Sequence, residues 1–292
     1  MSVNAVQHLK TYASLVKFSH TIFALPFALS MFIIVAQRYP FSVSQLICIL
    51  LALVTARTAA MAFNRLSDRN IDAKNPRTRE REIPAGKLSV REVYFLLLVN
   101  IICFIASAAY LGIHCLVLSP IVLFVLLGYS WTKRFTAAAH IFLGLALALA
   151  PGGVWYALTA QWSWTPIPLM LGVLLWVAGF DILYSCQDFD FDKANNLFSV
   201  PVKFGIQRSF IIARLLHLLA FLFLVEFGIV AQLGITYFIG VVVFGLIIAS
   251  QHLLISPNDL SRINAAFFTR NGIASVVFML VVWLDRVIVK LF

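Results

Sequence analysis

The chain has 292 residues, of which 62% are hydrophobic and 12% are charged, and its mean hydropathy is +0.95. So apolar a composition excludes a soluble globular protein and predicts an integral membrane protein. The formal net charge of +10 is explained by basic loops on the cytoplasmic side of a membrane, so we do not predict nucleic-acid binding.

Nine apolar runs are long enough to cross a bilayer, and they predict an all-α polytopic membrane protein. The first run is longer than the apolar part of a usual signal peptide, and no clear small-residue cleavage site follows it. Three of the runs, which begin at residues 115, 167 and 273, are short or interrupted, so eight or ten spans remain alternatives. The predicted spans are 18–36, 43–63, 93–113, 115–129, 138–160, 167–184, 210–231, 235–255 and 273–289.

Lys and Arg residues are concentrated in alternate connections between these spans. One side of the membrane carries most of them, including eight between Arg65 and Arg91. The other side carries only Arg38, Arg286 and Lys290. The positive-inside rule therefore predicts that the rich side is cytoplasmic, in a membrane that we expect to be the bacterial inner membrane.

The second apolar run leads into an acidic stripe. Asn64, Asp68 and Asp72 stand at i, i+4 and i+8, so at about 100° per residue they share one helix face if the helix continues. Such hard oxygen ligands suit Mg²⁺, which takes one or two carboxylates and completes its shell with water or substrate phosphate.

A second acidic stripe follows in the later half of the chain. Asp181, Asp188 and Asp192 stand at i, i+7 and i+11, which places them within about 20° of one line on a continuous helix, with Asp190 on another face. Carboxylates this close repel one another unless cations lie between them. Two such stripes predict metal ions that face a phosphorylated ligand.

Basic and phenolic residues accompany both stripes. Arg57 lies inside an apolar run, where an arginine is costly and is by default a functional candidate. Tyr129 and Lys133 stand at i and i+4 and share a helix face, and Lys17 stands at the entrance of the first span. Arginines, a lysine and a phenol beside metal-binding carboxylates are suited to holding a diphosphate.

The order of these motifs resembles the intramembrane aromatic prenyltransferases of quinone biosynthesis, the 4-hydroxybenzoate polyprenyltransferase family. The resemblance covers nearly the whole chain, with one departure at Glu82, where the family often has proline. The matching motifs are N-x-x-x-D-x-x-x-D at 64–72, R-T-x-x-R at 77–81, P-A-G at 84–86, Y-x-x-x-K-R at 129–134 and D-x-x-x-D at 188–192.

The resemblance implies a single membrane domain over residues 1–292, a nine-helix bundle with a central cavity that is capped on the cytoplasmic side. Its two acidic-motif halves would be roughly 1–137 and 138–292. The implied catalytic residues are Asp68, Asp72, Asp181, Asp188 and Asp192, and the implied ligands of Mg²⁺ are Asn64, Asp68, Asp72, Asp188 and Asp192. The implied substrate-binding residues are Lys17, Arg57, Asn64, Arg65, Tyr129, Lys133 and Arg134.

The implied reaction transfers a polyprenyl group from polyprenyl diphosphate to a ring carbon of an aromatic acid in ubiquinone or menaquinone synthesis. Either Asp181 or Asp188 would be the general base, and the acceptor would be 4-hydroxybenzoate or, alternatively, a dihydroxynaphthoate. Farnesyl transfer to haem is a second alternative in the same family. A secondary transporter would also carry intramembrane charges, but near the bilayer midplane, whereas these stripes lie at the ends of spans. Prenyl chain length and oligomeric state are not encoded in readable motifs.

Overall fold

The fold is built from α-helices, and the computed structural model describes residues 11–16 and 23–291, with side chains up to residue 288. No strand occurs in this described part of the chain. The helices group into two compact units that alternate in sequence. Of the described residues, the first unit holds 11–16 and 43–131, and the second holds 23–42 and 132–291.

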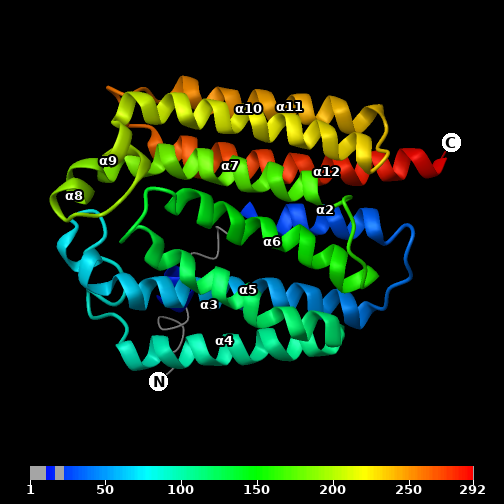
Figure 1. Cartoon of the computed structure of the whole chain (residues 1–292), viewed down its shortest axis with the longest axis horizontal. Coiled ribbons are helices and arrows are strands. Elements are labelled where there is room, and N and C mark those ends of the chain that lie inside the picture. The colour runs from blue at the N-terminus through cyan, green and yellow to red at the C-terminus, as the bar shows by residue number, and fades with distance from the viewer. Residues whose placement is uncertain (1–10, 17–22, 292) are drawn as a thin grey trace. The chain divides into compact units, whose positions relative to one another are not determined.

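Three long helices make up the first unit: α3 (Val43–Lys74), α4 (Val90–Leu111) and α5 (Ile113–Thr132) (Figure 1). The buried contact between α3 and α4 is formed by Ala59, Ala62 and Leu66 on one side and Val93 and Leu97 on the other. Alanines on α3 let the two backbones approach closely, which is how helices pack where the surrounding solvent is lipid.

Six longer helices make up most of the second unit. They are α2 (Leu25–Val35), α6 (Ala139–Thr159), α7 (Ile167–Ser185), α10 (Ile206–Val230), α11 (Ile235–Leu254) and α12 (Asn271–Leu291). Short elements connect them: a 3₁₀ turn η2 (Cys186–Asp188), helices α8 (Phe189–Ala194) and α9 (Val200–Phe204), and a π-helical segment η3 (Ala265–Arg270).

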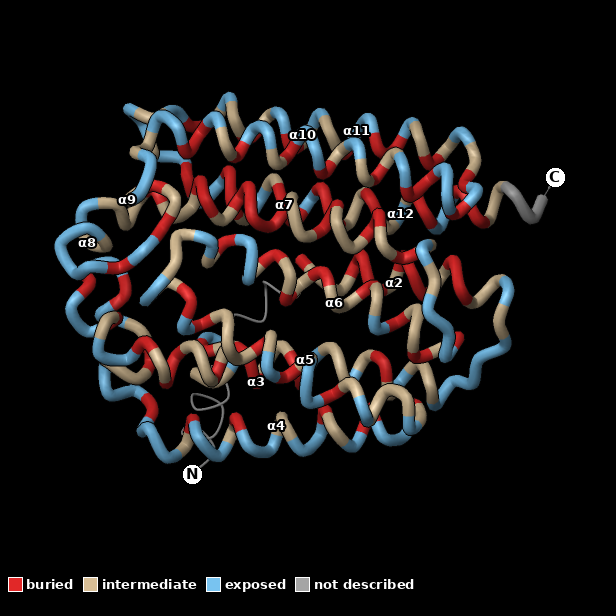
Figure 2. The backbone as a smooth tube through the Cα atoms, viewed as in Figure 1, coloured by how far each residue is buried: buried red, intermediate tan, exposed pale blue. Residues whose placement is uncertain are grey.

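Helix α7 is the centre of the second unit, and most of it is buried (Figure 2). It packs against α6 and α10, and glycines permit both contacts. A side chain at Gly144 would meet the backbone of Leu174, and one at Gly179 would meet His217.

Aromatic rings fill the core around α7. The Trp176 ring lies 5.1 Å from Phe27 of α2 and 6.0 Å from Phe244 of α11, and Phe27 lies 4.9 Å from Phe278 of α12, all measured between centroids. Tilted and edge-on ring pairs at these distances are favourable beyond their buried area. Helices that are distant in sequence are thereby held in one unit.

Eight helices in the described residues are long and apolar enough to cross a membrane, so the predicted all-α polytopic fold is confirmed. The helix in the first predicted span, 18–36, is shorter than predicted, because its described part forms the 11-residue helix α2. Residues 17–22 lie outside the described part of the chain. The last predicted span, 273–289, begins earlier, because the π-helical segment extends the helical path back to Ala265.

A buried carboxylate of α12 determines where α11 begins. Asp285 accepts hydrogen bonds from the backbone N–H groups of Gly234 (3.0 Å) and Tyr237 (3.2 Å) at the first turn of α11. Arg286 donates to the same carboxylate at 2.8 Å and to the carbonyl of Gln232 at 3.0 Å. This pair satisfies backbone groups at the start of α11 that have no partner within the helix.

Candidate active site

Helix α3 runs without a break through the first acidic stripe, so Asn64, Asp68 and Asp72 lie on one face of its last turns. The Asn64 amide nitrogen donates to a carboxylate oxygen of Asp68 at 3.3 Å and to the hydroxyl of Ser130 at 3.4 Å. Asp68 and Asp72 are 1% and 4% exposed. Buried carboxylates require partners that offset their lost hydration.

Arg81, in the loop after α3, supplies that partner for Asp72. Its Nη1 atom lies 2.7 Å and 2.8 Å from the two carboxylate oxygens. Thr78 also closes the loop onto the helix end, because its hydroxyl donates to the backbone carbonyl of Asp72 at 3.2 Å. The R-T-x-x-R motif therefore folds back onto the acidic stripe.

Glu82, where the resembled family often has proline, is buried in the same loop. It accepts a hydrogen bond from the hydroxyl of Ser14 at 2.6 Å, and Arg65 Nε lies 3.9 Å from its other oxygen. Arg65 is only 3% exposed, and Asp72 and Arg81 are also within its electrostatic range. The substitution of glutamate at this position gives the buried Arg65 a carboxylate partner.

Two further predicted residues belong to the same cluster. Tyr129 interacts electrostatically with Asp68, Arg65 and Arg57, and Arg57 Nη1 lies 3.5 Å from the carbonyl of Val16. The first unit thus gathers Arg57, Asn64, Arg65, Asp68, Asp72 and Tyr129 at one site. Lys17, the remaining predicted residue of this part of the chain, lies outside the described residues.

The second acidic stripe differs from its prediction, because the helix that carries it is not regular. The helical path runs from Ile167 to Ala194 but contains the 3₁₀ turn Cys186–Asp188. A 3₁₀ turn has three residues per turn, so the spacing of an ideal α-helix does not carry across it. Asp181 lies before the turn, Asp188 ends it, and Asp192 follows in α8.

Asp181 is paired with a histidine that the sequence analysis did not single out. His140 Nδ1 lies 2.7 Å from a carboxylate oxygen of Asp181, and the backbone N–H of Val200 donates to His140 Nε2 at 3.3 Å. Because Nε2 accepts, Nδ1 carries the proton and donates to Asp181. The pair joins α6, α7 and the start of α9.

Lys133 and Arg134 follow α5 and belong to the second unit. The carbonyl of Lys133 accepts a hydrogen bond from the N–H of Phe198 at 2.7 Å, which ties this segment to the loop after Asp192. Lys133 is half-buried, and Arg134 is exposed. Both cations therefore lie in the same unit as the second acidic motif.

The oxygen ligands of the first unit fit a magnesium ion that is shared with a phosphorylated substrate. Asn64 and Asp68 side chains are adjacent, and Mg²⁺ usually takes one or two carboxylates together with substrate phosphates. Throughout the described ranges, no group of three or more His, Cys, Asp or Glu residues could hold a metal by itself.

Comparison with protein families places the site in a known context. The UbiA prenyltransferase family matches residues 24–273. Among curated relatives, the protoheme IX farnesyltransferase of Synechocystis sp. is 36% identical over 45% of this chain and 43% of the relative. The 4-hydroxybenzoate octaprenyltransferase of Vibrio campbellii is 30% identical over 63% of this chain and 64% of the relative. The match thus spans less than two thirds of each of these two relatives.

Solved structures show a similar fold over almost the whole chain. A UbiA homologue from Aeropyrum pernix K1 has a TM-score of 0.82 and 30% identity, covering 94% of this chain and 98% of the homologue. A homologue from Archaeoglobus fulgidus, solved with GPP and Mg²⁺, has a TM-score of 0.69 and 20% identity, covering 95% and 99%.

Proposed function

Because this chain belongs to the UbiA prenyltransferase family, we propose that it transfers a polyprenyl group from polyprenyl diphosphate to a ring carbon of 4-hydroxybenzoate. Diphosphate is the second product. The observation that carries the proposal is the stripe of Asn64 and the buried Asp68 and Asp72, which is accompanied by Arg57, Arg65, Arg81 and Tyr129. Relatives that are named 4-hydroxybenzoate octaprenyltransferases support this acceptor.

The charges of this cluster support a role for Mg²⁺. Its three arginines are matched by three carboxylates, on Asp68, Asp72 and Glu82. A diphosphate brings additional negative charge, so this cluster must gain positive charge when the substrate binds. Asn64, Asp68 and Asp72 would hold one Mg²⁺ ion, and Asp188 and Asp192 would hold a second. Bound Mg²⁺ would neutralise charge that develops on the departing diphosphate.

The basic side chains orient and stabilise the leaving group. Arg57, Arg65, Lys17 and Lys133 hold diphosphate oxygens, and the Tyr129 hydroxyl donates to them. As the allylic C–O bond breaks, its electron pair goes to the diphosphate, and the prenyl carbon becomes electrophilic. A ring carbon of the acceptor supplies the electrons of the new C–C bond. The ring proton then passes to the carboxylate of Asp181 or Asp188.

The apolar helices contribute by excluding water, which would otherwise capture the electrophilic carbon. The polyprenyl tail remains in lipid or against apolar side chains throughout. Arg134, an exposed cation beside Lys133, holds the carboxylate of the aromatic acid. The site faces the cytoplasm of a bacterial cell, because the loops that carry both motifs are the basic ones.

Farnesyl transfer to haem is the second candidate, and the 36% identity to a protoheme IX farnesyltransferase favours it. The two candidates use the same diphosphate chemistry and differ in the acceptor. A dihydroxynaphthoate acceptor for menaquinone synthesis is a third possibility within the same chemistry.

The experiment that separates them measures diphosphate release by the purified protein with a short prenyl diphosphate, in Mg²⁺ or in a chelator. Each assay contains 4-hydroxybenzoate, a dihydroxynaphthoate, haem or no acceptor. We expect diphosphate release and a prenylated product only in the assay that contains both 4-hydroxybenzoate and Mg²⁺. If only the haem assay or only the dihydroxynaphthoate assay gave a prenylated product, that compound would be the acceptor in place of 4-hydroxybenzoate.

A further inference from the structure

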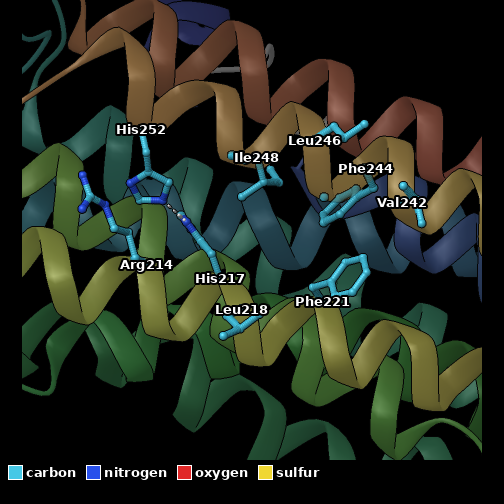
Figure 3. A pocket seen from close by; sticks show the side chains of 11 residues that line it. Arg214, His217, Leu218, Phe221, Val242, Phe244, Leu246, Ile248 and His252 are labelled. Carbon is cyan, nitrogen blue, oxygen red and sulfur yellow. Dashed lines mark hydrogen bonds between the residues drawn. The ribbon is translucent and has the colours of Figure 1, made fainter.

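An apolar groove runs between α10 and α11 in the second unit, away from both acidic motifs in sequence (Figure 3). Its volume is about 460 Å³, within the range of ligand-binding pockets. Most of its walls are aliphatic and aromatic, and one end is polar. The lining residues are Arg214, His217, Leu218, Phe221, Val242, Phe244, Gly245, Leu246, Ile248, Ala249 and His252.

The groove opens on a lipid-facing surface. Leu218 and Leu246 line it and are 56% and 65% exposed, and both belong to helices that are long and apolar enough to cross a membrane. In a bilayer such side chains contact acyl chains. An acyl chain can therefore enter this groove from the membrane.

Arg214 lies at the polar end of the groove beside His252 (Figure 3). It is exposed, although it stands eight residues after Ile206, where α10 begins, which is roughly 12 Å along the helix. An arginine within a span is costly unless it reaches the headgroup layer or meets a counter-ion. Its exposed guanidinium therefore requires an anion or water from outside the protein.

Hydrogen bonds indicate where the protons lie on the two histidines that line the groove with Arg214. The Trp176 indole can only donate, and it donates to Asn271 Oδ1 at 2.9 Å, so the Asn271 amide donates to Gln251 Oε1 at 3.2 Å. The Gln251 amide then donates to His217 Nδ1 at 3.3 Å, while His217 Nε2 donates to the Trp176 carbonyl at 3.3 Å.

His217 Nδ1 is therefore an acceptor, and His252 Nε2 donates to it at 2.8 Å. His217 therefore carries its one proton on Nε2, and His252 also carries a proton on Nε2. His252 Nδ1 is buried and without a hydrogen-bond partner in the described structure, so a second proton there would create an unpaired buried charge, and we infer that this ring is neutral as well. Arg214 is consequently the one formal charge among the residues that line the groove.

We propose that this groove binds one anionic phospholipid, with an acyl chain between α10 and α11 and the phosphate on Arg214. The headgroup of an anionic phospholipid such as phosphatidylglycerol has a net charge of about −1, which matches the single guanidinium, whereas the phosphate of phosphatidylcholine is already paired with its own ammonium group. A prenyl diphosphate carries more negative charge and would leave it uncompensated here. The site is separate from the proposed prenyl-transfer chemistry and does not depend on it.

The test is native mass spectrometry of the purified, delipidated full-length protein with equal amounts of phosphatidylglycerol and phosphatidylcholine. We expect the wild-type protein to retain phosphatidylglycerol preferentially. Arg214→Gln should reduce that preference by about tenfold, since a hydrogen bond to a charged group is lost, and Arg214→Lys should keep most of it. Arg208→Gln is the matched control, because Arg208 is exposed on the same helix but does not line the groove.

A second variant tests the groove itself without altering the charge. Ala249 is an exposed lining residue, so Ala249→Trp should fill the groove and lower retention of both lipids, with circular dichroism and gel filtration confirming an intact fold. The proposal is overturned if Arg214→Gln keeps the wild-type preference. It is also overturned if geranyl diphosphate displaces the phospholipid from the wild-type protein, because the groove would then be a site for prenyl diphosphate.

Discussion

At the residue scale, the ion pair between Asp72 and Arg81 fixes the position of one carboxylate of the first acidic motif. The carboxylate of Asp72 is nearly buried, and Arg81 Nη1 contacts both of its oxygens. We propose that Arg81 holds this carboxylate in one orientation until metal and diphosphate arrive. Arg81 is then a positioning residue for a metal ligand.

The variant Arg81→Gln should lower kcat/KM by about 10–100-fold and raise the Mg²⁺ concentration needed for half-maximal rate, as expected for a partner of a metal ligand. The measurement is a magnesium titration of diphosphate release. Arg79→Gln is the control, because Arg79 is in the same loop but pairs with an exposed carboxylate. Equal magnesium dependence in the two variants would contradict the positioning role.

His140 and Asp181 act as a coupled pair, because the histidine bridges a carboxylate and a backbone N–H. We expect His140→Ala and Asp181→Ala each to lower the free energy of unfolding by about 1–3 kcal/mol, since each leaves the other side chain, a buried histidine or a half-buried aspartate, without its hydrogen bond. The double variant should lose less free energy of unfolding than the sum of the losses in the two single variants. Unfolding in denaturant measures this cycle, and additive losses would show that the contact is not energetically coupled.

The sequence predicted the residues of the first stripe because helical periodicity alone places them together. It did not predict the roles of Arg81 and Glu82, which depend on how the loop after Lys74 turns back. The contact between His140 and Asp181 joins positions 41 residues apart, and no periodic spacing encodes it.

At the scale of elements, the two acidic motifs rest on different backbones. Helix α3 carries the first stripe on regular α-helical turns. The second stripe is interrupted by a 3₁₀ turn, with Asp181 before the turn and Asp192 after it. The apolar runs predicted the helices well, because a backbone in lipid must satisfy its own hydrogen bonds. The 3₁₀ and π segments were not predicted, since local polar contacts and packing select them and composition does not.

The start of α11 offers a test at this scale. Asp285 is 1% exposed and caps α11 while pairing with Arg286. Asp285→Ala leaves a buried arginine unpaired, so we expect the free energy of unfolding to fall by about 3–5 kcal/mol. Asp285→Asn should lower the free energy of unfolding by less than Asp285→Ala does, because the amide oxygen of asparagine still accepts one backbone N–H.

The measurement for these variants is denaturant unfolding in detergent micelles. Asp259→Ala serves as control. Asp259 is exposed in a loop, and its carboxylate also accepts a backbone N–H, that of Ser261. If Asp285→Ala were no less stable than Asp259→Ala, α11 would not depend on this cap.

At the scale of the whole molecule, the distribution of Lys and Arg predicts the orientation of the protein in the membrane. In a background without the native cysteines, we expect Ala85→Cys to react with a membrane-impermeant maleimide only in inside-out vesicles. Gln161→Cys should react only in intact spheroplasts. Both positions are exposed in loops between helices, and the reverse labelling pattern would invert the proposed orientation.

The central claim is that prenyl transfer requires Mg²⁺ and both acidic motifs. The measurement is diphosphate release with 4-hydroxybenzoate and a short prenyl diphosphate by the wild-type protein and by Asp68→Ala, Asp192→Ala and Asp190→Ala, with and without Mg²⁺. Asp190 is the matched control, because it is exposed on the same short helix as Asp192.

We expect the wild-type protein and Asp190→Ala to release diphosphate only when Mg²⁺ is present. Asp68→Ala and Asp192→Ala should release none, although both remain folded in detergent. Retained release in both of these variants would contradict a metal-assisted diphosphate site built from the two motifs.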